Sequence, residues 1–192
     1  MNLIVAWIAW LGIVGSGSVE ARPHVVIETE LGDIKIEIYQ DDAPVTAANF
    51  LKYVDGDHFR GASFYRVVRK GNQPDNDIKI EVIQGGLGRS EHEGRLPPIE
   101  HETTDKTGVL HKDGVISMAR LAPGTASSEF FICVCDQPEL DLGGRRNPDG
   151  QGFAAFGKVI EGMDVVRKIH QEPADGQSLA PPIGITAVLR VD

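Results

Sequence analysis

The feature that most constrains this chain is the segment 115–134, in which two short apolar runs flank a small, polar middle. The runs, Val115–Ala119 and Phe130–Val134, are rich in β-branched or aromatic residues, which is typical of strands. Pro123-Gly124 and Ser127-Ser128 lie between them and indicate a long exposed connection. Two core strands joined by a loop predict a β-rich domain.

The residues of this segment also form a recognisable signature. Residues 114–119 read GVISMA, residues 123–125 read PGT and residues 128–132 read SEFFI. In that order they resemble the central signature of the cyclophilin-type peptidyl-prolyl cis-trans isomerases. Further segments that occur in the order of that family are Asn49-Phe50-Leu51, Phe64–Val67, Val82–Gly86, Leu140-Asp141 and Phe156–Val159. The resemblance covers the chain from about Val25 to its C-terminus.

Hydrophobic periodicity predicts many short strands and two helices. Strands are expected at 25–30, 33–38, 64–68, 80–84, 115–119, 130–134, 153–160 and 183–191. In the last of these, Ile183, Ile185, Ala187, Leu189 and Val191 alternate and are expected to share one face. A helix is expected to begin near Pro44 and end at Gly56, and a second to cover 163–170.

This pattern fits a mainly β fold, a closed antiparallel barrel capped at its ends by helices. The resemblance to cyclophilins implies eight strands and two capping α-helices, a number that periodicity alone does not fix. With 41% apolar and 24% charged residues, the composition fits one globular domain. A formal net charge of −9 argues against non-specific nucleic-acid binding and against docking on anionic membranes.

The first 21 residues differ from the rest. An apolar run from Leu3 to Val14 is followed by residues 15–18, which read GSGS, and by compact residues at the −3 and −1 positions before Arg22. This is the pattern of a secretory signal peptide, although no Lys or Arg precedes the run. The run is shorter than the roughly 20 residues that span a bilayer. We therefore expect residues 1–21 to export the chain, to the periplasm, and residues 22–192 to form the domain. An uncleaved membrane tether is the alternative; after cleavage we expect no membrane span and a monomer.

The chemistry implied by the resemblance needs no metal and no cofactor. Rotation about an X–Pro bond is slowed by amide resonance, with a barrier of about 18–20 kcal/mol. A fixed N–H donor near the prolyl nitrogen and carbonyl would favour the twisted state. Arg66, permanently charged and rich in N–H groups, matches the catalytic arginine of the family. From the residues alone, a structural ion pair would be the simpler role. Gln84 matches the glutamine that supports this arginine and contacts substrate.

The resemblance also implies a substrate site for proline-containing or unfolded polypeptides. The hydrophobic proline pocket is expected to be formed by Val82, Phe131, Leu140 and Phe153, which could equally be plain core. Ala119 and Arg120 match a strand edge whose backbone pairs with an extended substrate.

Three acidic residues depart from the family pattern around this pocket. Glu81 stands where Phe is frequent, and Glu139 where many eukaryotic members carry the Trp that binds cyclosporin, so we expect weak cyclosporin inhibition. Glu129 replaces the usual Gln; either it pairs with Arg66 and competes with the substrate carbonyl, or it faces solvent. These acids leave open an alternative function, a non-catalytic proline-peptide binding or chaperone module.

Other polar features have simpler interpretations. Residues 70–79 form a polar loop that is longer than in most cyclophilins and is interpreted as an insertion. The clusters Glu91-His92-Glu93 and Glu100-His101-Glu102 match no metal-ligand spacing and are expected to be solvated loop. Cys133 and Cys135, two apart in a predicted strand, are too divergent to bridge easily and are expected to be core residues rather than a redox or metal pair.

Overall fold

A computed structural model describes residues 21–88 and 91–191 of the chain. The predicted export segment lies outside this range apart from Ala21. Within the described residues, every helix is too short or too polar to cross a lipid bilayer.

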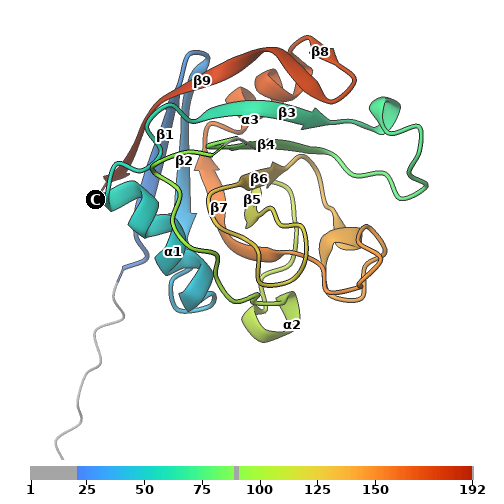
Figure 1. Ribbon diagram of the computed structural model, residues 1–192, viewed down its shortest axis with the longest axis horizontal. Coiled ribbons are helices and arrows are strands. Elements are labelled where there is room, and N and C mark those ends of the chain that lie inside the picture. The colour runs from blue at the N-terminus through green and yellow to red at the C-terminus, as the bar shows by residue number, and fades with distance from the viewer. Residues whose placement is uncertain (1–20, 89–90, 192) are drawn as a thin grey trace, which may run out of the picture.

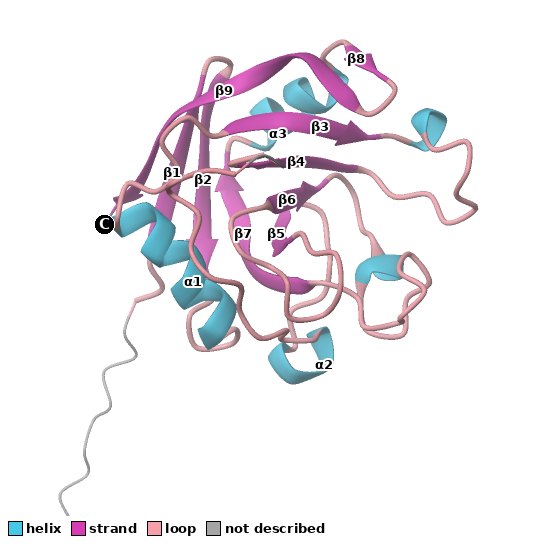
Figure 2. Ribbon diagram, viewed as in Figure 1, coloured by secondary structure: helices cyan, strands magenta, loops and turns pink. Residues whose placement is uncertain are grey.

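The described residues form nine strands and three α-helices (Figures 1 and 2). The strands are β1 (His24–Thr29), β2 (Gly32–Ile38), β3 (Ser63–Val68), β4 (Val82–Gly86), β5 (Val115–Met118), β6 (Phe130–Cys133), β7 (Ala154–Glu161), β8 (Ala174–Asp175) and β9 (Ser178–Val191). The helices are α1 (Pro44–Asp55), α2 (Thr104–Thr107) and α3 (Met163–Gln171), with 3-10 turns η1 (Lys70–Asn72) and η2 (Pro138–Leu140).

Eight of these strands close into an antiparallel barrel, which confirms the predicted fold class. Their order is β1-β2-β7-β5-β6-β4-β3-β9, and β9 pairs back onto β1, while the two-residue β8 adds only to β9. The two predicted helices are α1, which contacts β7 and β9, and α3, which contacts β2, β3 and β4. The one-turn α2 lies outside the two predicted helices.

Strand alternation divides the apolar residues between the inside and the outside of the barrel. In β6, Phe130 and Ile132 join the large interior core, while Phe131 and Cys133 belong to a second cluster. Successive side chains of a strand point to opposite faces of the sheet, so this second cluster lies on the outer face of the barrel. Phe50 of α1 packs into the interior, with its ring 5.1 Å from that of Phe156.

The alternation predicted for residues 183–191 is wrong in its second half. Ile183 and Ile185 are buried as predicted, but Val188 is buried in place of Leu189, which is 49% exposed. The pairing with β1 skips Thr186, so β9 carries a β-bulge there and the inward face shifts by one residue.

The two cysteines differ in environment. Cys133 is a buried core residue, as predicted, and burial raises the pKa of its thiol well above the usual range. Cys135 is exposed and has φ +64°, because β6 has already ended; its predicted core role is wrong.

Glu102 lies at the start of α1 rather than in open solvent, which corrects the interpretation of its cluster. Its carboxylate accepts hydrogen bonds from the backbone N–H of Val45 (3.1 Å) and of Thr46 (2.7 Å), and from the Thr46 hydroxyl (2.6 Å). These groups would otherwise be unsatisfied at the helix start. Among residues 21–88 and 91–191, no group of three His, Cys, Asp or Glu side chains could hold a metal ion.

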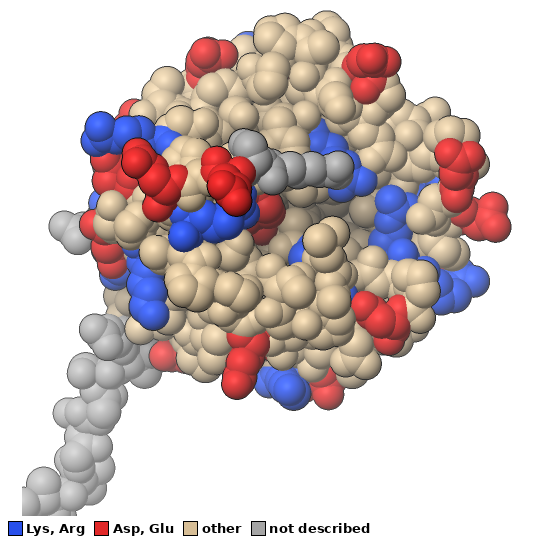
Figure 3. All heavy atoms as spheres, in the orientation of Figure 1, with Lys and Arg blue, Asp and Glu red and all other residues tan. Residues whose placement is uncertain are grey.

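Charges are mixed on the face seen in Figure 3. Asp and Glu side chains are interleaved with Lys and Arg, so neither sign forms one continuous patch on that face. This distribution is the one expected of a solvated surface.

Candidate active site

The residues predicted to form the proline pocket come together in the outer cluster. Its buried members are Val68, Ile80, Val82, Phe131, Cys133 and Leu140, and Ala119 and Phe153 pack against them. All four predicted pocket residues therefore belong to one apolar cluster on the outer face of the barrel, formed by β4, β6, η2 and the residue before β7.

The aromatic side chains of this cluster pack against His111, a residue that the sequence analysis missed. Phe131 and Phe153 meet edge to face with ring centroids 5.2 Å apart, and the His111 ring lies 5.9 Å from Phe131 at 15°. His111 bonds the carboxylate of Asp141 (2.7 Å) and the hydroxyl of Ser117 (2.9 Å). Because Ser117 is fully buried, this Ser–His–Asp arrangement cannot attack a substrate; it supports the aromatic pair.

Arg66, Gln84 and Phe131 form a row across three neighbouring strands. Arg66 on β3 is the direct partner of Gln84 on β4, which is in turn the partner of Phe131 on β6. Directly opposed side chains in a sheet are close neighbours on one face. The predicted donor therefore lies on the same outer face as the predicted pocket, two strands away from its aromatic wall.

A β-bulge brings a third polar side chain to this row. The β3–β4 register shifts between Phe64 and Arg66, which leaves Tyr65 as the extra residue. Gln84 Nε2 donates to the Tyr65 hydroxyl (2.8 Å), and Tyr65 in turn donates to the carboxylate of Glu129. Tyr65 is inside the family-like tetrapeptide 64–67, but nothing in the sequence pointed to Glu129 as its partner.

Two glutamines hold the guanidinium of Arg66. Nη1 donates to Gln84 Oε1 (2.7 Å), while Nε and Nη2 donate to Gln177 Oε1 (3.0 and 2.6 Å). The contact with Gln84 is the one expected of a supporting glutamine. Gln177, at the β8–β9 turn, was missed by the sequence analysis, since no motif marks it.

Glu129 is largely shielded from water, so the alternative that it faces solvent is wrong. Its side chain is 16% exposed, accepts a hydrogen bond from the Ser128 hydroxyl (2.9 Å) and lies 3.7 Å from an Arg95 nitrogen. Burial raises the pKa of its carboxyl group, against the opposing effects of Tyr65, Ser128 and Arg95. Glu129 therefore connects to Arg66 through Tyr65 and Gln84 and not by the direct pairing that was expected; competition with the substrate carbonyl stays a prediction.

Gly86 makes room for this carboxylate. It has φ +137°, and a Cβ there would lie 2.6 Å from the Ser128 carbonyl oxygen and 2.9 Å from the Glu129 carboxylate. Only glycine suits both that backbone conformation and that approach.

Ala119 and Arg120 lie beside the cluster. The Ala119 N–H donates to the Glu129 carbonyl (2.8 Å), which extends the pairing of β5 with β6. The Arg120 guanidinium lies 5.3 Å from the ring centroid of Phe153 and pairs with Asp149 (2.7 Å). The hydrogen bond from Arg120 lowers the pKa of Asp149 to about 2. Arg120 thus fastens the loop before β7 onto the pocket; a role of its backbone in substrate binding stays a prediction.

The other two acidic residues that depart from the family pattern form ion pairs near the surface. Glu81 lies 3.3 Å from the Lys70 ammonium nitrogen, and Glu139, on η2, lies 2.9 Å from Arg145. The hydrogen bonds from Arg145 lower the pKa of Glu139. Weak cyclosporin inhibition stays a prediction.

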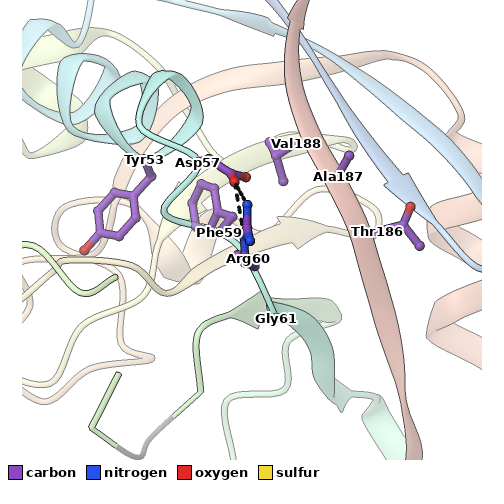
Figure 4. Close-up of a pocket in the computed structure, with 8 residues that line it drawn as sticks. All are labelled: Tyr53, Asp57, Phe59, Arg60, Gly61, Thr186, Ala187 and Val188. Carbon is purple, nitrogen blue, oxygen red and sulfur yellow. Dashed lines mark hydrogen bonds and ion pairs between the residues drawn. The ribbon is translucent and has the colours of Figure 1, made fainter. Parts of the chain in front are cut away.

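A separate cavity of about 350 Å³ lies between the end of α1 and the bulge of β9 (Figure 4). Its lining residues are Tyr53, Asp57, Phe59, Arg60, Gly61, Thr186, Ala187 and Val188. None of them is a predicted site residue, and its charged groups, Asp57 and Arg60, are already paired with each other at 2.6 Å. It therefore offers no arrangement for catalysis.

Comparisons with known proteins agree with the geometry. The family model described as "Cyclophilin type peptidyl-prolyl cis-trans isomerase/CLD" matches residues 24–189. The peptidyl-prolyl cis-trans isomerase of Acinetobacter baylyi is 36% identical over 165 residues, which cover 84% of this chain and 79% of that protein. Peptidyl-prolyl cis-trans isomerase B of Escherichia coli is 34% identical over 148 residues, covering 76% of this chain and 82% of that protein.

Solved structures show the same fold. The crystal structure of a cyclophilin-type isomerase of Cryptosporidium parvum in the presence of the dipeptide Ala-Pro superposes with a TM-score of 0.69 at 23% identity. The superposition covers 88% of this chain and 99% of the other.

Proposed function

The chain belongs to the cyclophilin-type peptidyl-prolyl cis-trans isomerases, enzymes that accelerate rotation about X–Pro bonds, and we propose that Arg66 is its catalytic donor. The observation that carries this assignment is the row Arg66, Gln84 and Phe131 on the outer face. It sets a guanidinium held by two glutamine carbonyls beside an apolar surface that suits a proline ring.

The physical task of these groups follows from the amide bond. The apolar surface around Val82 and Phe131 binds the proline ring, and the Arg66 N–H groups are directed at the prolyl carbonyl and nitrogen. As the bond twists, resonance is lost and the nitrogen becomes a hydrogen-bond acceptor, so the charged donor binds the twisted state more tightly than either planar state. Gln84 and Gln177 hold the donor in place before the substrate arrives, which avoids a cost in reorganisation.

Arg66→Ala tests the assignment. We expect the cis-to-trans rate of a short X–Pro peptide, measured at low temperature, to rise with wild type and the acceleration to fall about 100-fold or more in the variant. Arg145→Ala, which removes an exposed arginine paired with Glu139, is the control and should keep wild-type activity. Wild-type acceleration that survives in Arg66→Ala would contradict the assignment. A wild type that binds the peptide without accelerating it would instead favour the non-catalytic binding module.

The finer aspects of function are part of the same proposal: an exported monomer, cleaved after Ala21, that acts on unfolded polypeptides. Arg22 supports the boundary, because it already belongs to the fold through ion pairs with Glu37 (3.1 Å) and Asp42 (2.7 Å). The closed ring of strands supports a monomer, since closure of the barrel leaves few backbone groups for pairing with a second chain.

A further inference from the structure

The segment 70–79, between β3 and β4, is longer than the resemblance predicts and has no part in the proposed function so far. In Figure 1 the connection between these strands projects beyond the barrel. It begins with η1 (Lys70–Asn72), and its inner end lies against the turn between β8 and β9, where Gln177 is found.

Asn72 joins the segment to the barrel with all of its polar groups. Its side-chain oxygen accepts from the Arg69 N–H (2.7 Å), and its side-chain nitrogen donates to the carbonyls of Val67 (3.1 Å) and Gly176 (2.9 Å). Its backbone carbonyl accepts from Gln177 Nε2 (3.0 Å). Asn72 is therefore a fixed acceptor placed next to the Gln177 side chain.

The contact with Asn72 determines which way the Gln177 amide points. An amide has a donating nitrogen and an accepting oxygen. With Nε2 on the Asn72 carbonyl, Oε1 faces Arg66, where it accepts from both Nε and Nη2 (3.0 and 2.6 Å). If the amide were reversed, its oxygen would face the Asn72 carbonyl oxygen, and two acceptors would meet. Its NH2 group would then face the N–H groups of Arg66, and donors would meet. The Gln177 backbone is fixed as well, because its carbonyl accepts from the Val67 N–H (2.9 Å).

The outer end of the segment is braced against a different loop. Arg146 donates to Gln73 Oε1 (2.8 Å) and to the Ile78 carbonyl (2.6 Å). The buried Gln73 side chain donates to the carbonyls of Arg69 (2.7 Å) and Ile80 (2.8 Å). A segment held at both ends can keep Asn72 in one place.

We propose that the segment 70–79 is a positioning element for Arg66, which acts through Asn72 and Gln177. Gln84 and Gln177 together contact the planar guanidinium at three nitrogens, and three contacts fix its plane. Gln177 is thus a positioning residue for the reaction. This inference rests on the proposed function of Arg66, and it gives the inserted segment a task in catalysis.

The first test is Gln177→Met, which keeps the length of the side chain but removes both ends of the amide. We expect the catalysed isomerisation rate to fall about tenfold while the Kd for the same X–Pro peptide changes less than about twofold, because the donor is misdirected and the apolar surface is intact. In NMR spectra, the Arg66 Nε–H proton should exchange with water faster than in wild type. A structural role alone would move the melting temperature and not this proton.

Asn72→Ala tests the segment itself. It should lower the catalysed rate and speed the exchange of the Arg66 Nε–H proton, as Gln177→Met does. The variant that carries both substitutions should have the same rate as Gln177→Met alone, since both changes break the same chain of contacts. Asn76→Ala is the matched control: it lies in the same segment, where its side chain accepts from the Ile78 N–H (2.9 Å), and should leave the rate and the Arg66 proton unchanged.

The outcomes separate this inference from the proposed function. Wild-type rate and wild-type proton exchange in Gln177→Met would overturn the inference even if Arg66→Ala is inactive. An active Arg66→Ala would overturn the proposed function, and faster exchange in Gln177→Met would still support the contact between segment and guanidinium. Equal effects of Asn76→Ala and Asn72→Ala would overturn the specific path through Gln177.

Discussion

Folding alters the ionisation of Glu129 at the candidate site. Burial raises the pKa of its carboxyl group, so folding disfavours the charged form. Between the unfolded and the raised folded pKa, the native state binds more protons than the unfolded state, and stability therefore falls as pH rises. The replacement of the usual glutamine by this acid should cost stability at neutral pH and not in acid.

Glu129→Gln tests this sign. The free energy of unfolding of the variant should exceed that of wild type by more at pH 7 than at pH 4, with a difference on the order of 1 kcal/mol between the two pH values. Denaturant titrations at the two pH values measure it, with Glu100→Gln, an exposed acid elsewhere on the chain, as control. A difference that is constant with pH, or that grows in acid, would contradict the burial argument. The same variant gives the turnover comparison, which we expect to increase if Glu129 competes with the substrate carbonyl.

At the residue scale, what could be predicted depends on sequence distance. Gln84 and Phe131 lie in short strands whose alternation fixes the face, and all three residues of the row lie in segments that match a family. Arg66 reaches the outer face only because of the bulge at Tyr65, since alternation alone would place it on the inner face with Phe64. Gln177 meets Arg66 across 111 positions, from a turn that carries no motif, so no local pattern could reveal it. The bond between Tyr65 and Glu129 likewise depends on a bulge that appears only when β3 and β4 are paired.

At the scale of elements, the start of α1 depends on a distant side chain. Pro44 indicated where the helix begins, but the acceptor for its first N–H groups is Glu102, 56 positions after Thr46. The charge of Glu102 also suits the positive end of the helix dipole. A cap from so far away cannot be read from the local sequence.

Glu102→Ala should lower the free energy of unfolding by about 1–2 kcal/mol, because three hydrogen bonds at the helix start lose their acceptor. Thermal and denaturant unfolding measure the change. Glu100→Ala, an exposed acid in the same loop, is the control and should stay within about 0.5 kcal/mol of wild type. Equal stability of the two variants would show that the cap contributes nothing.

The other helices and strands were predicted by hydrophobic periodicity, except where strand pairing changed which residues are buried. The hairpin of β1 and β2, the helices α1 and α3, and the two central strands lie close to their predicted bounds. The bulge in β9 shifted the inward face because register against β1, and not the period of the strand, decides which residues are buried.

At the scale of the whole molecule, the proposed export has a direct consequence. Glu20 is the only charged residue among the first 21, so removal of this segment changes the formal net charge from −9 to −8. Protein recovered from the cell envelope should begin at Arg22 on N-terminal sequencing. Recovery of the chain with Met1 in the membrane fraction would favour the tether instead.

The ring of strands also dictates when activity can begin. β1 bonds to β9 along its whole length, and β9 also pairs with β3, which carries Arg66. Until residues 178–191 are paired, the polypeptide has an open sheet, and Arg66 has no Gln177 beside it. Such long-range contacts form late, after most of the chain is available. A chain in which β9 is not yet paired therefore lacks part of the site, and activity begins only once the barrel has closed.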